Sequence, residues 1–327
     1  MTVIALSTMW AQQERFRGQR ILGFAAFARD HGFTHIEVNY AIPPQEVETL
    51  VRGGILPISS LHAPAPLVKH RDGRWNHTLN LASRDEEERR AMVAYTKRTI
   101  DVTAEAGGSA VVVHLGHIGD GAMFEEEREL RRLHECRQAD DPRCAELRAR
   151  AAERRRREAP RYFPQAERSL AELAEHAARR GVTIGLESRF HFHEFPNVEE
   201  CLTLIAGYPP EVVGFWLDTG HVEVLDRLGF IPKGRWLDVL GDRLVGMHLH
   251  DVDGITDHRA VGLGDIRWDG LRQGVVTRPL YVFEINQRQP DWAVARSVTL
   301  LQDLGVVPRP EAARGTEERG PGAAGAP

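Results

Sequence analysis

Seven side chains that can bind a metal ion stand at or near the ends of short apolar segments of the sequence. In chain order they are His62, His114, Glu187, Asp218, His248, His250 and Glu284. Carboxylate oxygen and imidazole nitrogen are donors that divalent cations take in proteins. A fold that gathers many strand ends at one opening would therefore bring these residues together as a metal site.

Glu187, Asp218, His250 and Glu284 are the first candidates for this site. They close four successive apolar segments, VTIGLE, VGFWLD, LVGMHLH and LYVFE. Three acids beside one histidine would be anionic without an ion, so we expect a divalent cation there: manganese, magnesium, cobalt or zinc. His248 stands two residues before His250 and shares its face of the strand, so His248 could be the ligand instead or support it from below. One ion is expected, and further histidines would allow up to three.

The remaining histidines near strand ends could bind substrate or act as additional metal ligands. They are His62, His114, His221 and His258. His221 follows Asp218 in LDTGH, where it could reach a substrate oxygen or a second ion, or cap a helix. His258 lies in a polar loop after HLHD, and the neighbouring Arg259 could pair with a carboxylate, phosphate or hydroxyl of a ligand. The glycines of GLGD in this loop are expected to allow a close approach to the opening.

Short apolar runs alternate with helix-like stretches along most of the chain, as in α/β folds. The expected strands are Val3–Leu6, His35–Asn39, Ile58–His62, Ala110–His114, Thr183–Glu187, Gly214–Asp218, Leu244–His250 and Leu280–Ile285. Ligand-type residues recur at almost every strand end rather than at one switch point of an open sheet. We therefore predict a (β/α)8 TIM barrel, whose chemistry lies at the carboxyl ends of its strands.

Four helices have clear signals between these strands. They are expected at Phe16–His31, Arg84–Ala106, Gln165–Arg180 and Trp292–Leu304, each followed by a glycine as a stop signal. Ser83 is the expected N-cap of the second, with Glu86 three residues further on.

Residues from about 119 to 164 exceed what a minimal barrel needs. This stretch contains EEERELRRLHECRQ and ELRARAAERRRREAPR around a turn. We expect a charged helical insertion after the fourth strand, either a solvated hairpin or a lid or oligomer contact. Residues 1–307 are expected to form one barrel domain including this insertion, and the tail 308–327 is expected to be disordered.

Composition limits the class of protein. The chain has 327 residues, 42% of them hydrophobic, and a formal net charge of -5, which favours a globular fold without a general polyanion-binding surface. The start resembles no signal peptide and no apolar run is long enough to span a membrane. Three cysteines without a CxxC motif fit a reducing cytoplasm. We expect a cytoplasmic protein, with a homo-oligomer an open alternative.

From about His35 to Leu304 the chain resembles the xylose isomerase-like barrel superfamily. The motifs that carry the resemblance, in this order, are SLHAP, VVVHLG, GLES, LDTGH, HLHD…DHRAVGLGD and FEIN. The superfamily includes sugar phosphate isomerases/epimerases and the endonuclease IV type of apurinic-site nuclease. The resemblance implies that Glu187, Asp218, His250 and Glu284 hold a catalytic divalent ion, that the two glutamates exchange a proton with the substrate, and that His221 binds substrate.

The nuclease branch offers a competing match. Its three-zinc site has histidines where this chain has His62, His114, His221, His248 and His258, and acids where it has Glu187, Asp218 and Glu284. Asp257 matches a further acid loosely. Against this branch, the nuclease pattern has Asn at the position of His250, and basic, aromatic loops for DNA are not evident.

We therefore predict a metal-dependent isomerase or epimerase of a sugar, keto-sugar or related polyol, acting through an enediolate with Glu187 and Glu284 as bases and His221 at the substrate. Alternatives are a multinuclear phosphodiesterase of the nuclease type, a keto-sugar lyase or dehydratase on the same site, and a non-catalytic binding protein. The expected partner is a small-molecule sugar or keto-polyol, without nucleic acid or membrane. Specificity would come from loop side chains such as Trp10, Arg189, Phe190, His191 and Arg259.

Overall fold

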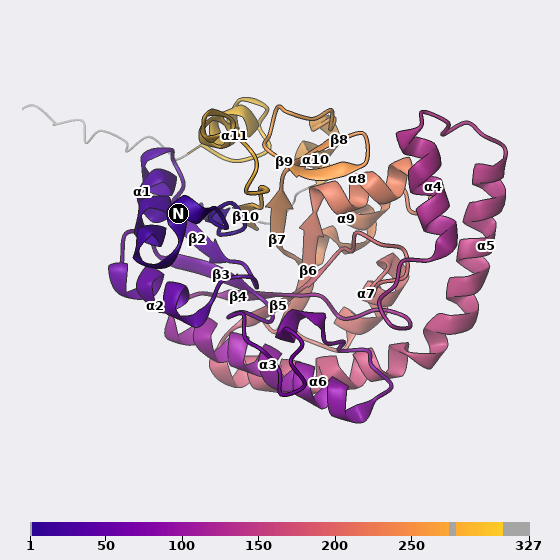
Figure 1. Cartoon of the computed structure of the whole chain (residues 1–327), viewed down its shortest axis with the longest axis horizontal. Coiled ribbons are helices and arrows are strands. Elements are labelled where there is room, and N and C mark those ends of the chain that lie inside the picture. The colour runs from indigo at the N-terminus through magenta and orange to yellow at the C-terminus, as the bar shows by residue number, and fades with distance from the viewer. Residues whose placement is uncertain (1, 275–278, 310–327) are drawn as a thin grey trace, which may run out of the picture.

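The apolar segments form eight parallel strands that close into one barrel (Figure 1). A computed structural model describes residues 2–274 and 279–309 of the chain. The barrel strands are β1 (Ile4–Ser7), β2 (His35–Val38), β3 (Ile58–His62), β4 (Ala110–Val113), β5 (Thr183–Glu187), β6 (Val213–Asp218), β7 (Leu244–Leu249) and β10 (Leu280–Phe283). Around the ring the order is β1-β10-β7-β6-β5-β4-β3-β2. The predicted (β/α)8 barrel is confirmed.

Helices connect the strands on the outside of the barrel. They are α1 (Ile21–Asp30), α2 (Pro44–Gly53), α3 (Glu86–Glu105), α4 (Glu125–Glu135), α5 (Arg143–Glu158), α6 (Phe163–Arg180), α7 (Val198–Ala206), α8 (Thr219–Arg227), α9 (Gly234–Leu240), α10 (Asp269–Gly274) and α11 (Asp291–Asp303). Short 3-10 turns are η1 (Glu14–Phe16), η2 (Gly18–Arg20), η3 (Asn76–Thr78), η4 (Ala159–Arg161) and η5 (Gly241–Arg243).

The start of the first predicted helix and the N-cap of the second differ from the prediction. The helix expected from Phe16 begins only at Ile21, because Gly18 has a φ of +62° that a helix does not continue through. The N-cap of α3 is Asp85 rather than Ser83, since the Asp85 carboxylate accepts hydrogen bonds from the backbone N–H groups of the first turn.

A small apolar core fills the inside of the barrel. Its residues are Ala5, Ala110, Val112, Trp216 and Val282, all at most 1% exposed. Gly185 and Gly246 make room for the indole of Trp216, because a Cβ atom would lie only 2.8 Å and 2.3 Å from it at these two positions. Since side chains alternate along a strand, the next inward positions of these strands lie above this core and face the mouth.

The segment between β4 and β5 carries two helices before α6. Figure 1 shows α4 and α5 side by side at the right-hand edge, outside the ring of barrel helices. Both helices lie within residues 119–164, the stretch for which a charged helical insertion was predicted.

The polar segment after β7 is more regular than predicted. It forms an antiparallel hairpin of β8 (Asp251–Asp253) and β9 (Thr256–Arg259), where the sequence suggested only a loop. Asp251 holds the following GLGD turn through the backbone N–H groups of Val252, Gly262 and Ile266. A Cβ on Gly264 would lie 2.5 Å from the Asp251 carboxylate, so the glycines serve an approach to Asp251 rather than to the mouth.

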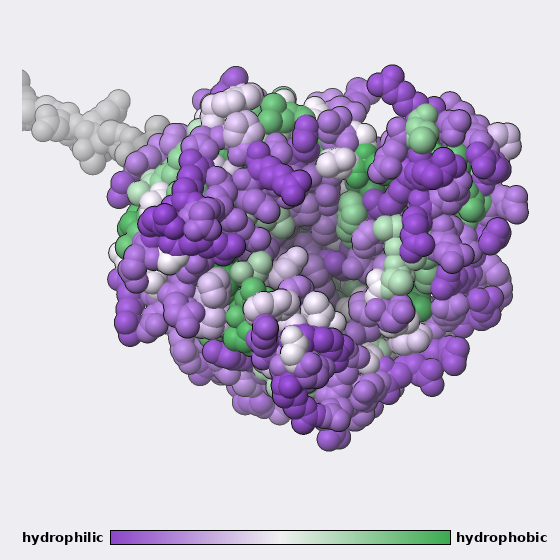
Figure 2. Space-filling view, viewed as in Figure 1, coloured by the Kyte–Doolittle hydropathy of each residue, from purple (hydrophilic) through white to green (hydrophobic). Residues whose placement is uncertain are grey.

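The surface is mainly hydrophilic and is hollowed near the centre of the view in Figure 2. No helix within the described residues is long and apolar enough to cross a membrane. Of the tail predicted to be disordered, residues 310–327 lie outside the described part of the chain.

Candidate metal centre and active site

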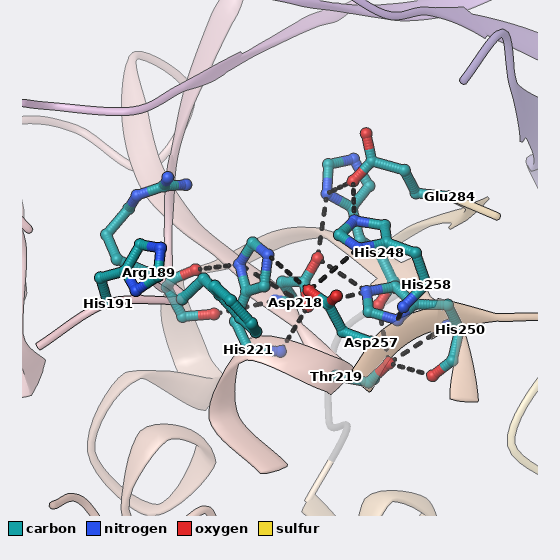
Figure 3. Close-up of polar contacts among 12 residues, drawn as sticks. Arg189, His191, Asp218, Thr219, His221, His248, His250, Asp257, His258 and Glu284 are labelled. Carbon is teal, nitrogen blue, oxygen red and sulfur yellow. Dashed lines mark hydrogen bonds and ion pairs between the residues drawn. The ribbon is translucent and has the colours of Figure 1, made fainter. Parts of the chain in front are cut away.

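Four side chains from neighbouring strands meet at the carboxyl end of the barrel. Glu187 ends β5, Asp218 ends β6, His248 lies in β7, and Glu284 directly follows β10. All four are buried, and each offers one donor atom that lies within 4.8 Å of the others. Figure 3 shows Asp218, His248 and Glu284 turned toward one another.

The structure places His248 within this group of donor atoms, whereas His250, the ligand expected first, contacts Asp218 from the side. His248 Nδ1 lies 2.5 Å from Glu187 Oε1 and 3.1 Å from Glu284 Oε2. The strand register explains why His248 stands where His250 was expected, because β7 pairs with β6 so that His248 is level with Asp218. His250 lies about two strand residues nearer the mouth, roughly 7 Å further along the strand axis.

His250 supports the centre from the side. Its Nε2 lies 3.0 Å from both carboxylate oxygens of Asp218, and its ring stacks on His258 at a centroid distance of 4.2 Å. Gly220 permits this position, because a Cβ there would lie 2.1 Å from the His250 ring. Asp218 also caps α8 by accepting a 2.7 Å hydrogen bond from the backbone N–H of His221. The LDTGH motif therefore places the acid Asp218, the start of α8 and His221 next to one another.

Sequence reasoning missed the residues that close the centre from below and from the side. Glu37 of β2 is fully buried, and its Oε1 lies 3.1 Å from His248 Nε2, while the Ser60 hydroxyl donates to its Oε2 at 2.9 Å. Asn39 donates from Nδ2 to Glu284 Oε1 at 3.0 Å. The sequence contained a signal for both residues, because HIEVN places the acid Glu37 and the amide Asn39 two positions apart, on the same face of a strand.

The acids around His248 set its charge. Burial lowers the pKa of His248, but the negative charges of Glu284, Glu37 and Glu187 outweigh burial and hold this pKa well above its usual value. Burial raises the pKa of Glu284, whereas His248 and His258 lower it by more, so that the carboxyl is ionised. The protein alone thus supplies one shared imidazolium to several buried carboxylates.

Three further groups of possible ligands overlap the centre. They are His62–His248–Glu284, His62–His114–Glu187 and Asp218–His221–His258. Their histidines other than His248 were expected to bind substrate or further ions, and the structure brings all four to the mouth.

The loosely matched Asp257 also belongs here, since its Oδ2 lies 2.9 Å from His258 Nδ1. His221 Nδ1 donates to the Ser188 carbonyl at 2.9 Å, which leaves Nε2 as an acceptor for a proton or an ion.

The donor set fits a divalent cation. Carboxylate oxygens and imidazole nitrogens converge from four strands, and this set suits zinc, manganese, magnesium or cobalt. The His114 Nε2 atom is buried beside the Glu187 carboxylate without a well-directed hydrogen bond. Buried carboxylates in this number are costly unless they are paired or coordinate a metal.

A cavity of about 330 Å³ lies over the centre. Its lining consists of Met9, Tyr40, His62, His114, Arg189, Phe190, His191, Glu194, His221, Asp257, His258 and Glu284. Arg259, expected at the substrate, is not part of this lining and pairs with Asp253 at 3.4 Å instead. Arg189 provides the guanidinium, because its NH1 lies 2.7 Å from Glu187 Oε2 and its NH2 lies 3.2 Å from Glu194 Oε1.

The α4–α5 pair holds the loop that carries Arg189, Phe190 and His191. Glu127 of α4 is fully buried and accepts hydrogen bonds from His191 Nδ1 and Phe192 N, both at 3.0 Å. Arg131 donates to Glu127 Oε1 at 2.8 Å and to the Phe190 carbonyl at 2.9 Å. The helical pair therefore packs against a wall of the cavity and is more than a solvated hairpin.

Arg155 of α5 makes the second attachment to this loop. It donates to the Phe192 carbonyl at 2.7 Å and to Glu200 Oε2 at 2.6 Å.

Burial raises the pKa of Glu127, but the hydrogen bond from His191 and the charge of Arg131 outweigh burial and lower this pKa below its usual value. The loop next to Glu187 thus depends on buried charges supplied by the helical pair.

The sequence of the chain was compared with those of known protein families and proteins. The sequence profile described as the xylose isomerase-like TIM barrel matches residues 25–298. The uncharacterized protein y4fM of Sinorhizobium fredii is 23% identical over 288 residues, 81% of this chain and 80% of that protein.

Solved structures with the same fold include an L-ribulose 3-epimerase (TM-score 0.64, 17% identity, 94% of this chain and 95% of that chain covered). Another is the 3-keto-D-glucoside 4-epimerase YcjR of E. coli (TM-score 0.62, 16% identity, 93% and 99% covered).

The geometry of β7 predicts different effects for its two histidines. His248→Ala removes a donor from the centre and should abolish tight binding of Mn²⁺ or Zn²⁺. His250→Ala removes a partner of Asp218 and should weaken binding by about 10–100-fold. Calorimetric titration of metal-free protein measures both, and an equal or larger loss for His250→Ala would restore His250 as the ligand.

The attachment of the cavity loop to α4 predicts a large effect for a residue remote from the centre. Glu127→Ala leaves Arg131 without its buried partner and should lower the free energy of unfolding by about 3–5 kcal/mol. Glu129→Ala on the same helix removes a solvent-accessible pair with Arg132 and should leave the free energy of unfolding nearly unchanged. Urea unfolding of both variants tests this difference, and limited proteolysis should show cleavage near residues 188–196 only in Glu127→Ala.

Proposed function

The chain belongs to the xylose isomerase-like TIM barrel family, and on this premise we propose that it is a divalent-metal-dependent isomerase or epimerase of a sugar, keto-sugar or related polyol. The observation that carries the proposal is the pair of buried carboxylates, Glu187 and Glu284, which both approach His248 Nδ1 beneath an open cavity. The two solved structures described above are named as sugar epimerases, which supports the same reaction class.

Glu187, Asp218, His248 and Glu284 would hold the ion, which is manganese, magnesium, cobalt or zinc. When bound, a divalent cation polarises a substrate carbonyl and acidifies the neighbouring C–H bond. The donor atoms already lie close together, so little rearrangement of the chain is needed to bind it.

The two glutamates are placed to move the proton. One carboxylate would remove the proton from the carbon beside the carbonyl, and the other would return a proton from its own side, through an enediolate. Asn39 fixes Glu284 by a 3.0 Å hydrogen bond, and Arg189 fixes Glu187 by a 2.7 Å hydrogen bond. Both carboxylates therefore keep a defined direction while substrate binds.

The cavity walls supply groups for the substrate hydroxyls. His221 and His258 line one side, and His62 and His114 line the other. Each imidazole can donate or accept one hydrogen bond, which suits a polyhydroxyl ligand.

Glu284→Gln should nearly abolish turnover while the fold is kept, because a positioned acid or base contributes roughly 10²–10⁴-fold. Glu105→Gln, at an exposed helix position, is the matched control and should behave like the unmodified protein. The assay is NMR of ketose and keto-polyol isomerisation, with incorporation of solvent deuterium at carbon as a second readout. Full activity of Glu284→Gln would remove Glu284 from the proton transfer.

A multinuclear phosphodiesterase is the second candidate. The observation that favours it is the presence of two additional clusters, His62–His114–Glu187 and Asp218–His221–His258, beside the first. Together they could hold up to three ions, the number expected for a nuclease-type centre. In this reaction the protein would position a phosphodiester where an activated water attacks it.

Metal content separates the two candidates. Elemental analysis of protein purified without chelators or a metal-binding tag should find one ion per chain for the isomerase or epimerase. Two or three ions per chain, with loss of the extra ions in His114→Ala, would favour the phosphodiesterase. Cleavage of DNA containing an apurinic site by metal-replete protein would then decide for that activity, and absence of cleavage would remove it.

A further inference from the structure

A second chamber opens beside the cavity over the metal centre. It has a volume of about 400 Å³, and four residues, Tyr40, His114, Arg189 and Glu194, line both spaces. Its lining also includes the imidazoles of His117 and His193 and the apolar side chains of Pro64, Leu79 and Met92. The shared residues make the chamber an extension of the cavity, on the side of β3 and β4.

One wall of the chamber is polar and firmly built. Asn80 donates to the His117 carbonyl at 3.0 Å and accepts from the His117 backbone N–H at 3.1 Å. Gly116 permits this contact, because its φ is +114° and a Cβ there would lie 2.3 Å from Asn80 Oδ1. His193 is 2% exposed, and its Nδ1 has no hydrogen-bond partner within the described chain. Imidazole groups are thus held ready for hydrogen bonds with a ligand.

Part of the lining of the chamber is apolar. Pro64, Leu79 and Met92 are buried and line it, while His77 and Thr78 stand exposed at its rim. A sugar ring has apolar C–H faces and polar edges, so a chamber lined by both apolar and polar side chains suits it. Cavities of a few hundred Å³ are typical of small-molecule sites.

The charges of the lining argue against an anionic ligand. Among the lining residues, all in the described part of the chain, Arg189 is the one arginine or lysine, and it is bonded to Glu187 and Glu194. Asp120 adds a negative charge at the rim. Burial lowers the pKa of His117, and it lowers the pKa of His193 to about 4, so these rings are neutral near pH 7. A phosphate would find no free positive charge there.

Resting on the proposed function, we propose that the substrate has two parts. The reacting keto-sugar occupies the cavity over the metal centre, and an uncharged glycosyl unit joined to it occupies the chamber. Tyr40, Arg189 and Glu194 lie at the passage between the two units, and the histidines of the chamber bind the hydroxyls of the second.

The experiment compares four probes that share one ketose. D-fructose is the free sugar, lactulose and isomaltulose carry a glycosyl unit at two different positions, and D-fructose 6-phosphate carries an anion. Binding to metal-replete protein is measured by calorimetry, and isomerisation is followed by NMR. At least one glycosylated probe should bind about tenfold or more tighter than D-fructose, as one or two added hydrogen bonds would provide. The phosphate should bind no tighter than D-fructose.

Two surface variants locate the effect. Thr78→Trp places an indole at the rim of the chamber, and Thr203→Trp places one on the exposed face of α7. Both threonines are exposed and bond a nearby backbone carbonyl, so both variants should fold alike. The preference for the glycosylated probe should be lost in Thr78→Trp and kept in Thr203→Trp, while the affinity for D-fructose stays unchanged in both.

The outcomes separate this inference from the proposed function. If free ketoses are turned over and glycosylated probes are not preferred, the proposal that the chamber binds a glycosyl unit is overturned and the proposed reaction stands. A preference that Thr78→Trp removes, without turnover of any sugar, supports the chamber and overturns the reaction. Preference for D-fructose 6-phosphate, or no binding of either glycosylated probe, overturns the two-part substrate.

Discussion

The structure depends on a group of carboxylates buried at the mouth of the barrel. Glu37, Glu187, Asp218 and Glu284 all lie within ion-pair distance of one imidazole, His248, and are at most 2% exposed. Ionised carboxylates in such a place are strongly unfavourable unless positive charge and hydrogen bonds compensate them. Arg189 and a protonated His248 supply that charge in the metal-free protein, and a divalent ion bound to neutral His248 would supply it in place of the His248 proton. The barrel, the loops and the helical pair outside it can be understood through what they contribute to this group.

The packing inside the barrel sets the height of the metal-site residues above the core and the distances between them. Trp216 and four small apolar side chains fill the interior, so the polar residues of the next layer are raised to the mouth instead of pointing into a pore. The ring of Trp216 lies 5.2 Å from that of His248 and forms the floor of the centre. Because this packing is dense, the ligands have little freedom to move away from one another.

The helical pair contributes charge from outside. Glu127, Arg131 and Arg155 hold the segment after β5 by its backbone and thereby fix Arg189 against Glu187. The same segment carries Glu194 and His193 into the wall of the second chamber. One loop thus links three features that are far apart in sequence: the added helices, the metal centre and the space beside it.

The sequence by itself determined the barrel and most of its strand ends. Runs such as VTIGLE and VGFWLD identify Glu187 and Asp218 because strand alternation and apolar content are local properties. It did not determine the choice between His248 and His250, which depends on the register of β7 against β6, or the inclusion of Glu37, which depends on β2 closing the ring. Only the tertiary structure decided which residues Glu127 and Arg189 contact. It also decided that the guanidinium in the cavity lining belongs to Arg189 and not to Arg259. In each case the deciding neighbour lies on another element, and no local pattern records the height or direction at which two elements pack.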